Sequence, residues 1–122
     1  MGVLLQERST TGTAIDRVHL AAYTMSDPEL EQEILGLFRD SLRDLLLQLQ
    51  GAVGCPDPWM RLTHTIKGSA RGVGAFALGD AAAAAERDTS GDAPCQRAHI
   101  VTLRACADDV FYEIDQLTAP GL

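Results

Sequence analysis

The segment Trp59–Ala75, WMRLTHTIKGSARGVGA, decides how the rest of the chain is interpreted. At about 100° per residue, a helix over this segment separates apolar and small side chains from basic ones. His64 falls near the middle of the polar side, with Lys67 and Gly68 beside it one turn further along. The predicted inward side is Trp59, Leu62, Ile66, Ser69, Ala70 and Val73, and the predicted outward side is Met60, Arg61, His64, Lys67, Gly68 and Arg71.

Two glycines, Gly68 and Gly72, lie close to the row of His64. Glycine inside a helix costs roughly 1 kcal/mol relative to alanine, so something must offset that cost. A missing side chain at position 68 clears room for another molecule beside the imidazole, and Lys67 can neutralise an anion carried there. This is what a phosphoryl-carrying histidine requires; the alternative is an exposed helical histidine beside an incidental lysine.

The run His64–Ala70 (HTIKGSA), followed by the pair Gly74–Ala75, resembles the signature of histidine-containing phosphotransfer (HPt) domains. The usual form is Ala-His-x-Leu-Lys-Gly-Ser-Ala, with a Gly-Ala pair a turn later. The likeness spans roughly residues 15–117, and includes an Asp-Pro-Glu helix start and an Ala-rich helix that ends in Glu. Thr63 and Ile66 depart from the usual Ala and Leu without touching the polar face.

The resemblance implies a phosphoryl relay. His64 would accept a phosphoryl group from a receiver-domain aspartate, carry it on the ring nitrogen farthest from the backbone, and pass it to another receiver aspartate. Lys67 would neutralise the phosphoryl oxygens, and Gly68 would let the receiver close in. The implied partners are response-regulator receiver domains and a (hybrid) histidine kinase. The receiver would bring Mg²⁺, and no cofactor is expected on this chain. The expected docking residues are Met60, Arg61, Arg71 and Gly72.

The charge of the chain is acidic overall and basic around the histidine. A formal charge of −7 over 122 residues disfavours nucleic acid and anionic membranes, which bind basic surfaces. Between Pro58 and Gly79 there is no Asp or Glu, and the only charged residues are Arg61, Lys67 and Arg71. We therefore expect a local basic patch that would attract the acidic pocket of a receiver domain, although surface charges also cluster by chance.

The stretch Ser26–Glu29 (SDPE) predicts the start of a long helix, with Asp27 as candidate N-cap and Pro28 in the first helical position. A capping box formed by Ser26 and Glu29 is the alternative. Apolar residues then recur at intervals of three and four to about Gln50, which predicts a core-facing stripe. A dimer zipper is less favoured, because the stretch is too short for sustained heptads. The predicted stripe is Leu30, Ile34, Leu37, Phe38, Leu42, Leu45 and Leu49.

Three further helices follow from the same kind of pattern. Asp57–Pro58 is expected to begin the histidine helix, Phe76 to about Asp88 forms the next helix, and Pro94 opens the last one. The predicted inward residues of these last two helices are Leu78, Ala82 and Ala85, and then Ile100, Leu103, Ala107, Val110, Ile114 and Leu117.

These patterns predict an all-α fold: an antiparallel up-and-down four-helix bundle with a short N-terminal capping helix. Residues 1–14 are expected to be a flexible polar lead, and residues 15–122 to form one HPt-like domain. Four apolar stripes close a core without a second copy, so a monomer is the simplest expectation. In the capping helix, expected within residues 15–24, the predicted inward residues are Ile15, Val18, Ala22 and Tyr23.

The three cysteines and the N-terminus bear on cellular compartment and metal binding. No apolar run is long enough to cross a bilayer, and the first residues do not resemble a signal peptide. Cys55, Cys95 and Cys106 form no disulfide framework, so reduced thiols in a cytoplasm are the simplest interpretation. Cys95, His99 and Cys106 share one side of the last helix, but Cys106 lies about 10 Å beyond His99 along its axis. No metal site is therefore predicted.

Other functions fit the sequence less well. Gly72–Gly74 does not complete a nucleotide-binding fingerprint, so we expect a phosphocarrier and not a kinase that uses ATP. A phosphorylation-silent adaptor that binds receivers as scaffold or inhibitor is the main alternative, and intact His64, Lys67 and Gly68 argue against it. In the dimeric hairpin of histidine kinases an acidic residue typically follows the histidine, where this chain has Thr65. A hydrolase would need a Ser, Cys or carboxylate partner, and none lies within a turn of His64 on its face.

Overall fold

The computed structural model describes residues 14–118, which are helical apart from short connections and contain no strand. The predicted all-α fold is confirmed. The expected polar lead, residues 1–14, lies outside the described residues except for Ala14, as do residues 119–122. The helices are α2 (Arg17–Thr24), α3 (Pro28–Gly51), α4 (Pro56–Val73), α5 (Phe76–Arg87) and α6 (Ala93–Thr118).

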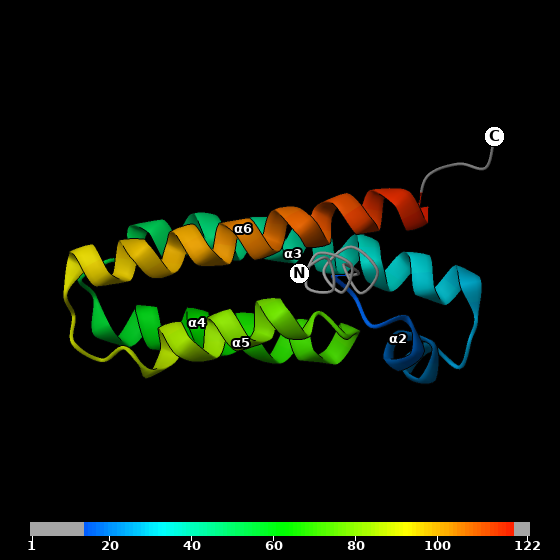
Figure 1. Ribbon diagram of the computed structural model, residues 1–122, viewed down its shortest axis with the longest axis horizontal. Helices are drawn as coiled ribbons and strands as arrows, with labels where there is room; N and C mark the ends of the chain where they lie inside the picture. Colours follow the sequence, from blue (N-terminus) through cyan, green and yellow to red (C-terminus); the bar gives the residue numbers. More distant parts are fainter. Residues whose placement is uncertain (1–13, 119–122) are drawn as a thin grey trace, which may run out of the picture.

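The four long helices form a closed ring of contacts. α4 packs against α3 and α5, and α6 packs against α5 and α3, while the backbones of the diagonal pairs lie farther apart. Figure 1 shows the pair α4 and α5 along one side of the bundle and the pair α3 and α6 along the other, with successive helices antiparallel. The short α2 lies at one end against α3 and α4. The predicted bundle with a capping helix therefore describes the arrangement.

The starts of α3 and α4 differ in how they are capped. Asp27 caps α3 as predicted, since its carboxylate accepts two backbone N–H groups of the first turn and Pro28 is the first helical residue. α4 begins two residues earlier than Pro58, at Pro56, and its N-cap Cys55 makes no side-chain cap hydrogen bond. Asp57 therefore lies inside the first turn. There its negative charge interacts favourably with the helix dipole, but Asp57 is not the N-cap residue.

The predicted stripe of α3 is confirmed at Phe38, Leu42, Leu45 and Leu49 but wrong at Leu37. Leu35 and Leu46 are buried, whereas Leu37 is 64% exposed. Leu35 and Leu37 lie about 200° apart around a helix, so only one of them can face the core. The apolar stripe of α6 is confirmed from Ile100 to Ile114, and its buried face extends to Gln96, whose Oε1 accepts the backbone N–H of Gly54 at 2.7 Å. The buried residues of α3 are Leu35, Phe38, Leu42, Leu45, Leu46 and Leu49.

The prediction of inward residues for the capping helix is wrong except at Ile15, which is buried. Val18, Ala22 and Tyr23 are exposed, and the buried residues of this helix are Leu20 and Thr24. The helix orientation is set by Asp16, which caps α2 with its side chain and donates its backbone N–H to the carbonyl of Gly74 at 2.8 Å. An eight-residue helix carries too little periodicity to reveal this rotation from sequence.

Gly74 ends α4 and joins it to the N-terminal segment. Its φ of 90° is left-handed, and both it and Ala75 donate backbone N–H groups to carbonyls of the last turn of α4. A Cβ at Gly74 would lie 2.8 Å from the backbone oxygen of Asp16. The glycine is therefore required both by its conformation and by the close approach of the chain.

We predict that Gly74→Ala lowers the free energy of unfolding by about 1–3 kcal/mol, because alanine is strained at this φ and its Cβ would press on Asp16. Gly68→Ala is the matched control, since a Cβ there meets nothing within 4 Å and should stabilise the helix by up to about 1 kcal/mol. Urea unfolding of both variants measures the difference. Equal stabilities would contradict the packing described for Gly74.

Candidate functional site

His64 projects from the middle of α4 on its outward side, and its side chain is 67% exposed. The inward side of the same helix is anchored in the core, as predicted, except that Thr63 is buried and Ser69 is only half-buried. Thr63 satisfies its hydroxyl by donating to the carbonyl of Trp59 at 2.8 Å. The buried residues of α4 are Trp59, Leu62, Thr63, Ile66, Ala70 and Val73.

The carboxylate of Glu86, from the end of α5, bridges His64 and Lys67. Its Oε2 lies 2.9 Å from His64 Nδ1, and its Oε1 lies 2.7 Å from Lys67 Nζ. The hydrogen bond from Lys67, followed by that from His64, lowers the pKa of Glu86 below its usual value. Glu86 is therefore ionised at neutral pH and can only accept hydrogen bonds.

An ionised Glu86 selects one tautomer of the neutral His64 ring. Because a carboxylate offers no proton, the 2.9 Å contact requires Nδ1 to carry the hydrogen and donate it. The lone pair of the neutral ring is then on Nε2, the nitrogen farther from the backbone. The arrangement can therefore present Nε2 as a nucleophile while the rest of the ring is held in place.

Glu86 is a site residue that is absent from the sequence-based prediction, although the sequence contains a signal for it. α4 and α5 form an antiparallel hairpin with its turn at Gly74 and Ala75, so residues at equal distances from that turn face each other. His64 lies about as far before the turn as Glu86 lies after it. The register of the hairpin, applied to the Glu at the end of the Ala-rich helix, is therefore the signal that points to this pairing.

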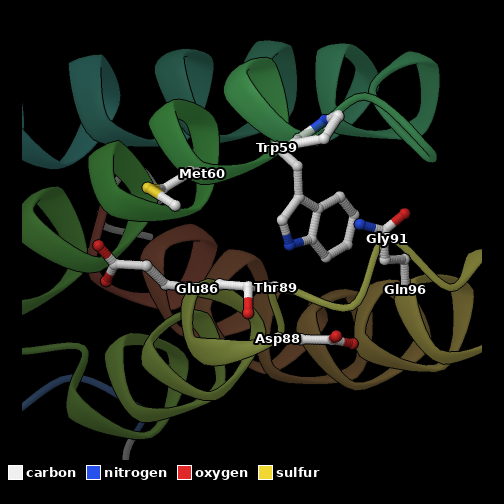
Figure 2. Close-up of a pocket in the computed structure, with 8 residues that line it drawn as sticks. Trp59, Met60, Glu86, Asp88, Thr89, Gly91 and Gln96 are labelled. Carbon is white, nitrogen blue, oxygen red and sulfur yellow. The ribbon is translucent and has the colours of Figure 1, made fainter.

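A buried contact holds the end of α5 in this register. The indole Nε1 of Trp59 donates to the carbonyl of Ala85 at 2.9 Å, one residue before Glu86. Figure 2 shows the indole reaching from α4 toward the end of α5, with Met60 and Glu86 at the other end of the same small cavity. That cavity measures about 30 Å³, enough for one or two water molecules and too small for a substrate.

The basic patch predicted around His64 is less positive than expected, because carboxylates of α5 pair with two of its cations. Lys67 is paired with Glu86, and Arg71 NH2 lies 3.3 Å from an oxygen of Asp80. Arg71 crosses Gly79 to reach Asp80, since a Cβ at Gly79 would lie 2.8 Å from the Arg71 side chain. Two of the three cations around the histidine are thus neutralised by the facing helix. A count of the charged residues along α4 alone does not reveal these pairs.

The sequence-predicted docking residues share the outer side of α4. Met60, Arg61 and Arg71 are exposed and surround His64, whereas Gly72 is half-buried. Gly68 is exposed, and a Cβ built on it would meet nothing within 4 Å. Packing inside this chain therefore does not require a glycine at position 68.

The cysteines and His99 do not assemble into a metal site. Across residues 14–118 no group of three or more His, Cys, Asp or Glu side chains could hold a metal ion. His99 Nε2 lies 3.2 Å from a carboxylate oxygen of Asp88. Burial raises the pKa of the Cys106 thiol, and a hydrogen bond with Asp92 raises that of Cys95, so both thiols are protonated at neutral pH.

No helix within residues 14–118 combines the length and the apolar character needed to cross a bilayer. The family model described as Hpt domain matches residues 33–113, a span that runs from α3 to α6 and contains both His64 and Glu86. No curated protein and no solved structure matches the chain. Since the match covers well over half of the sequence, the protein belongs to the Hpt domain family, whose members carry out histidine phosphotransfer in phosphorelays with receiver domains and kinases.

Proposed function

We propose that His64 is the phosphoacceptor of this chain. Its Nε2 attacks the phosphorus of an aspartyl phosphate on a receiver domain; the P–O bond to the aspartate breaks as the P–N bond forms. A second receiver aspartate then takes the phosphoryl group by the reverse exchange. The observation that carries the proposal is the 2.9 Å contact between Glu86 and Nδ1, which leaves Nε2 with the lone pair on an exposed ring.

Lys67 supplies positive charge beside the transferred group. Its ammonium has three donors, of which the contact with Glu86 uses one. The remaining donors can meet the phosphoryl oxygens, and the 2.7 Å contact with Glu86 holds the ammonium close to the imidazole. Phosphoryl transfer depends mainly on alignment and charge stabilisation, both of which this arrangement supports. The receiver domain would bring the divalent cation.

Gly68 leaves bare helix beside the imidazole for the receiver to approach. The open space around its Cα supports this role, because a glycine that no internal contact requires still carries the helix-propensity cost. Met60, Arg61, Arg71 and Gly72 would surround the contact. We place the relay in the cytoplasm, between a histidine kinase, hybrid or not, and response regulators; this fits the free thiols of Cys55, Cys95 and Cys106.

We predict that wild-type protein gains an acid-labile phosphoryl adduct from a phosphorylated receiver domain or from phosphoramidate, and that His64→Gln gains none. Intact mass before and after acid treatment measures the adduct. The solvent-exposed His19 provides the matched control, because His19→Gln should be phosphorylated like wild type. A wild-type protein that binds receivers but takes up no phosphoryl group would favour the silent-adaptor alternative.

We predict that Glu86→Ala slows phosphoryl transfer between about ten- and a hundred-fold, because the imidazole loses the acceptor that orients it and fixes its tautomer. Asp80→Ala removes a carboxylate from the same helix, but one that contacts Arg71 and not His64. That control should keep a rate near wild type. Single-turnover transfer from a phosphorylated receiver measures both, and equal rates for the two variants would remove Glu86 from the mechanism.

We predict that Gly68→Gln weakens receiver binding and blocks transfer while leaving the fold intact, because its side chain would stand on the approach to His64. Gly36→Gln is the control: Gly36 is also helical with nothing within 4 Å of a built Cβ, but it lies on α3. Receiver affinity and transfer rate are measured for both variants. Normal transfer by Gly68→Gln would show that the bare backbone has no docking role.

A further inference from the structure

The outward face of α6 carries large apolar side chains that no other helix covers. Val101 is 69% exposed and Tyr112 is 68% exposed. At about 100° per residue the two lie within roughly 20° of each other around the helix. This places both on the side of α6 opposite the stripe from Ile100 to Ile114 that packs into the bundle. α6 therefore presents an outward seam that carries an apolar side chain at each of two points about 16 Å apart.

Charged residues flank this seam with opposite sign in its two halves. Arg97 and Arg104 lie on the N-terminal half, Asp108 lies on the C-terminal half, and all three are exposed. Throughout the part of the chain that the structure describes, none of these three side chains forms an ion pair; the pairs are those at Arg39, His64, Lys67, Arg71 and His99. A copy of the helix laid in the opposite direction would bring positive charge onto negative charge.

We propose that α6 packs against α6 of a second copy of this chain, antiparallel about a two-fold axis near Cys106. Arg104 stands two residues before that point and Asp108 two residues after it, so each arginine faces the aspartate of the other copy. Val101 and Tyr112 stand at nearly equal distances on either side and face each other in the same way. The interface is isologous, and each contact forms twice. Ala105, close to the axis, lets the backbones approach.

A hollow beside the seam fits the aromatic ring that the second copy would bring. It lies between the end of α3 and the first half of α6 and has a volume of about 410 Å³. Its apolar floor and two guanidinium groups suit a tyrosine ring, which gains from apolar burial and from cation–π contact. Tyr112 of the opposing helix is the residue that this arrangement brings to it. The lining residues are Gln50, Val53, Arg97, Ile100, Val101 and Arg104.

The proposed interface is separate from the histidine site. The backbone of α6 lies close to those of α3 and α5 but not to that of α4, which carries His64. Two copies joined through α6 would each keep an exposed His64, so one assembly could engage two receivers at once. The closed ring of four helices lets a single chain fold alone. The proposed dimer therefore forms between two folded bundles, through their surfaces. The proposal goes beyond phosphotransfer and does not rest on it.

Charge reversal on the full chain tests the proposal by sedimentation and light scattering over a concentration series. The average mass of wild type should rise with concentration from 13.1 kDa toward twice that value, and added salt should reverse the rise. Arg104→Glu and Asp108→Arg should each stay monomeric, because each sets like charges against one another in a homodimer. An equimolar mixture of the two variants should regain the doubled mass, since every reversed charge then meets its opposite.

Arg17→Glu is the control, because it makes the same charge change on α2 and should associate like wild type. A wild type that stays at monomer mass at all concentrations would overturn the proposal, as would a mixture of the two reversed variants that stays monomeric. Phosphoryl transfer is measured alongside and should be unchanged in every variant. If Arg104→Glu loses transfer from the receiver while keeping the wild-type mass, the face binds the receiver and not a second copy.

Discussion

The packing of α5 against α4 is the constraint on which the histidine site depends. Buried alanines on α5, such as Ala82 and Ala85, let the two helices approach closely, and the indole N–H of Trp59 fixes the end of α5 through the carbonyl of Ala85. Glu86 follows directly and reaches both His64 and Lys67. A contact in the hydrophobic core thus decides which nitrogen of an exposed imidazole carries the proton, and links packing to reactivity.

Three glycines of the α4–α5 hairpin, Gly68, Gly74 and Gly79, differ in the physical reason for the missing side chain. Gly74 is required by its positive φ and by the nearby backbone of Asp16, and Gly79 leaves space for the side chain of Arg71. Gly68 has neither reason, since a side chain there would meet only open space. The loss of helix propensity at position 68 is offset by nothing inside the bundle. The proposed role of Gly68 in receiver docking would account for this cost.

Opposite sides of the bundle carry surfaces of different character. On α4, the cations next to His64 are largely neutralised by carboxylates of α5, so the proposed phosphoryl site would depend on placed donors more than on excess positive charge. On α6, Arg104 and Asp108 have no ion-pair partner among residues 14–118 and stand beside the outward seam. The bundle separates the two surfaces because α4 and α6 occupy diagonal positions in the ring.

The sequence by itself determined the four long helices, the cap at Asp27, the exposure of His64 and the apolar stripe of α6, because periodicity and capping depend on residues within a few turns of each other. It misplaced Leu37, whose spacing fits two overlapping stripes, and the inward side of α2, which is too short to show a period. Only the tertiary structure decided that Glu86 faces His64 and that Asp80 faces Arg71. Those pairings depend on the register of the hairpin and the rotation of each helix, which packing sets across distant parts of the chain.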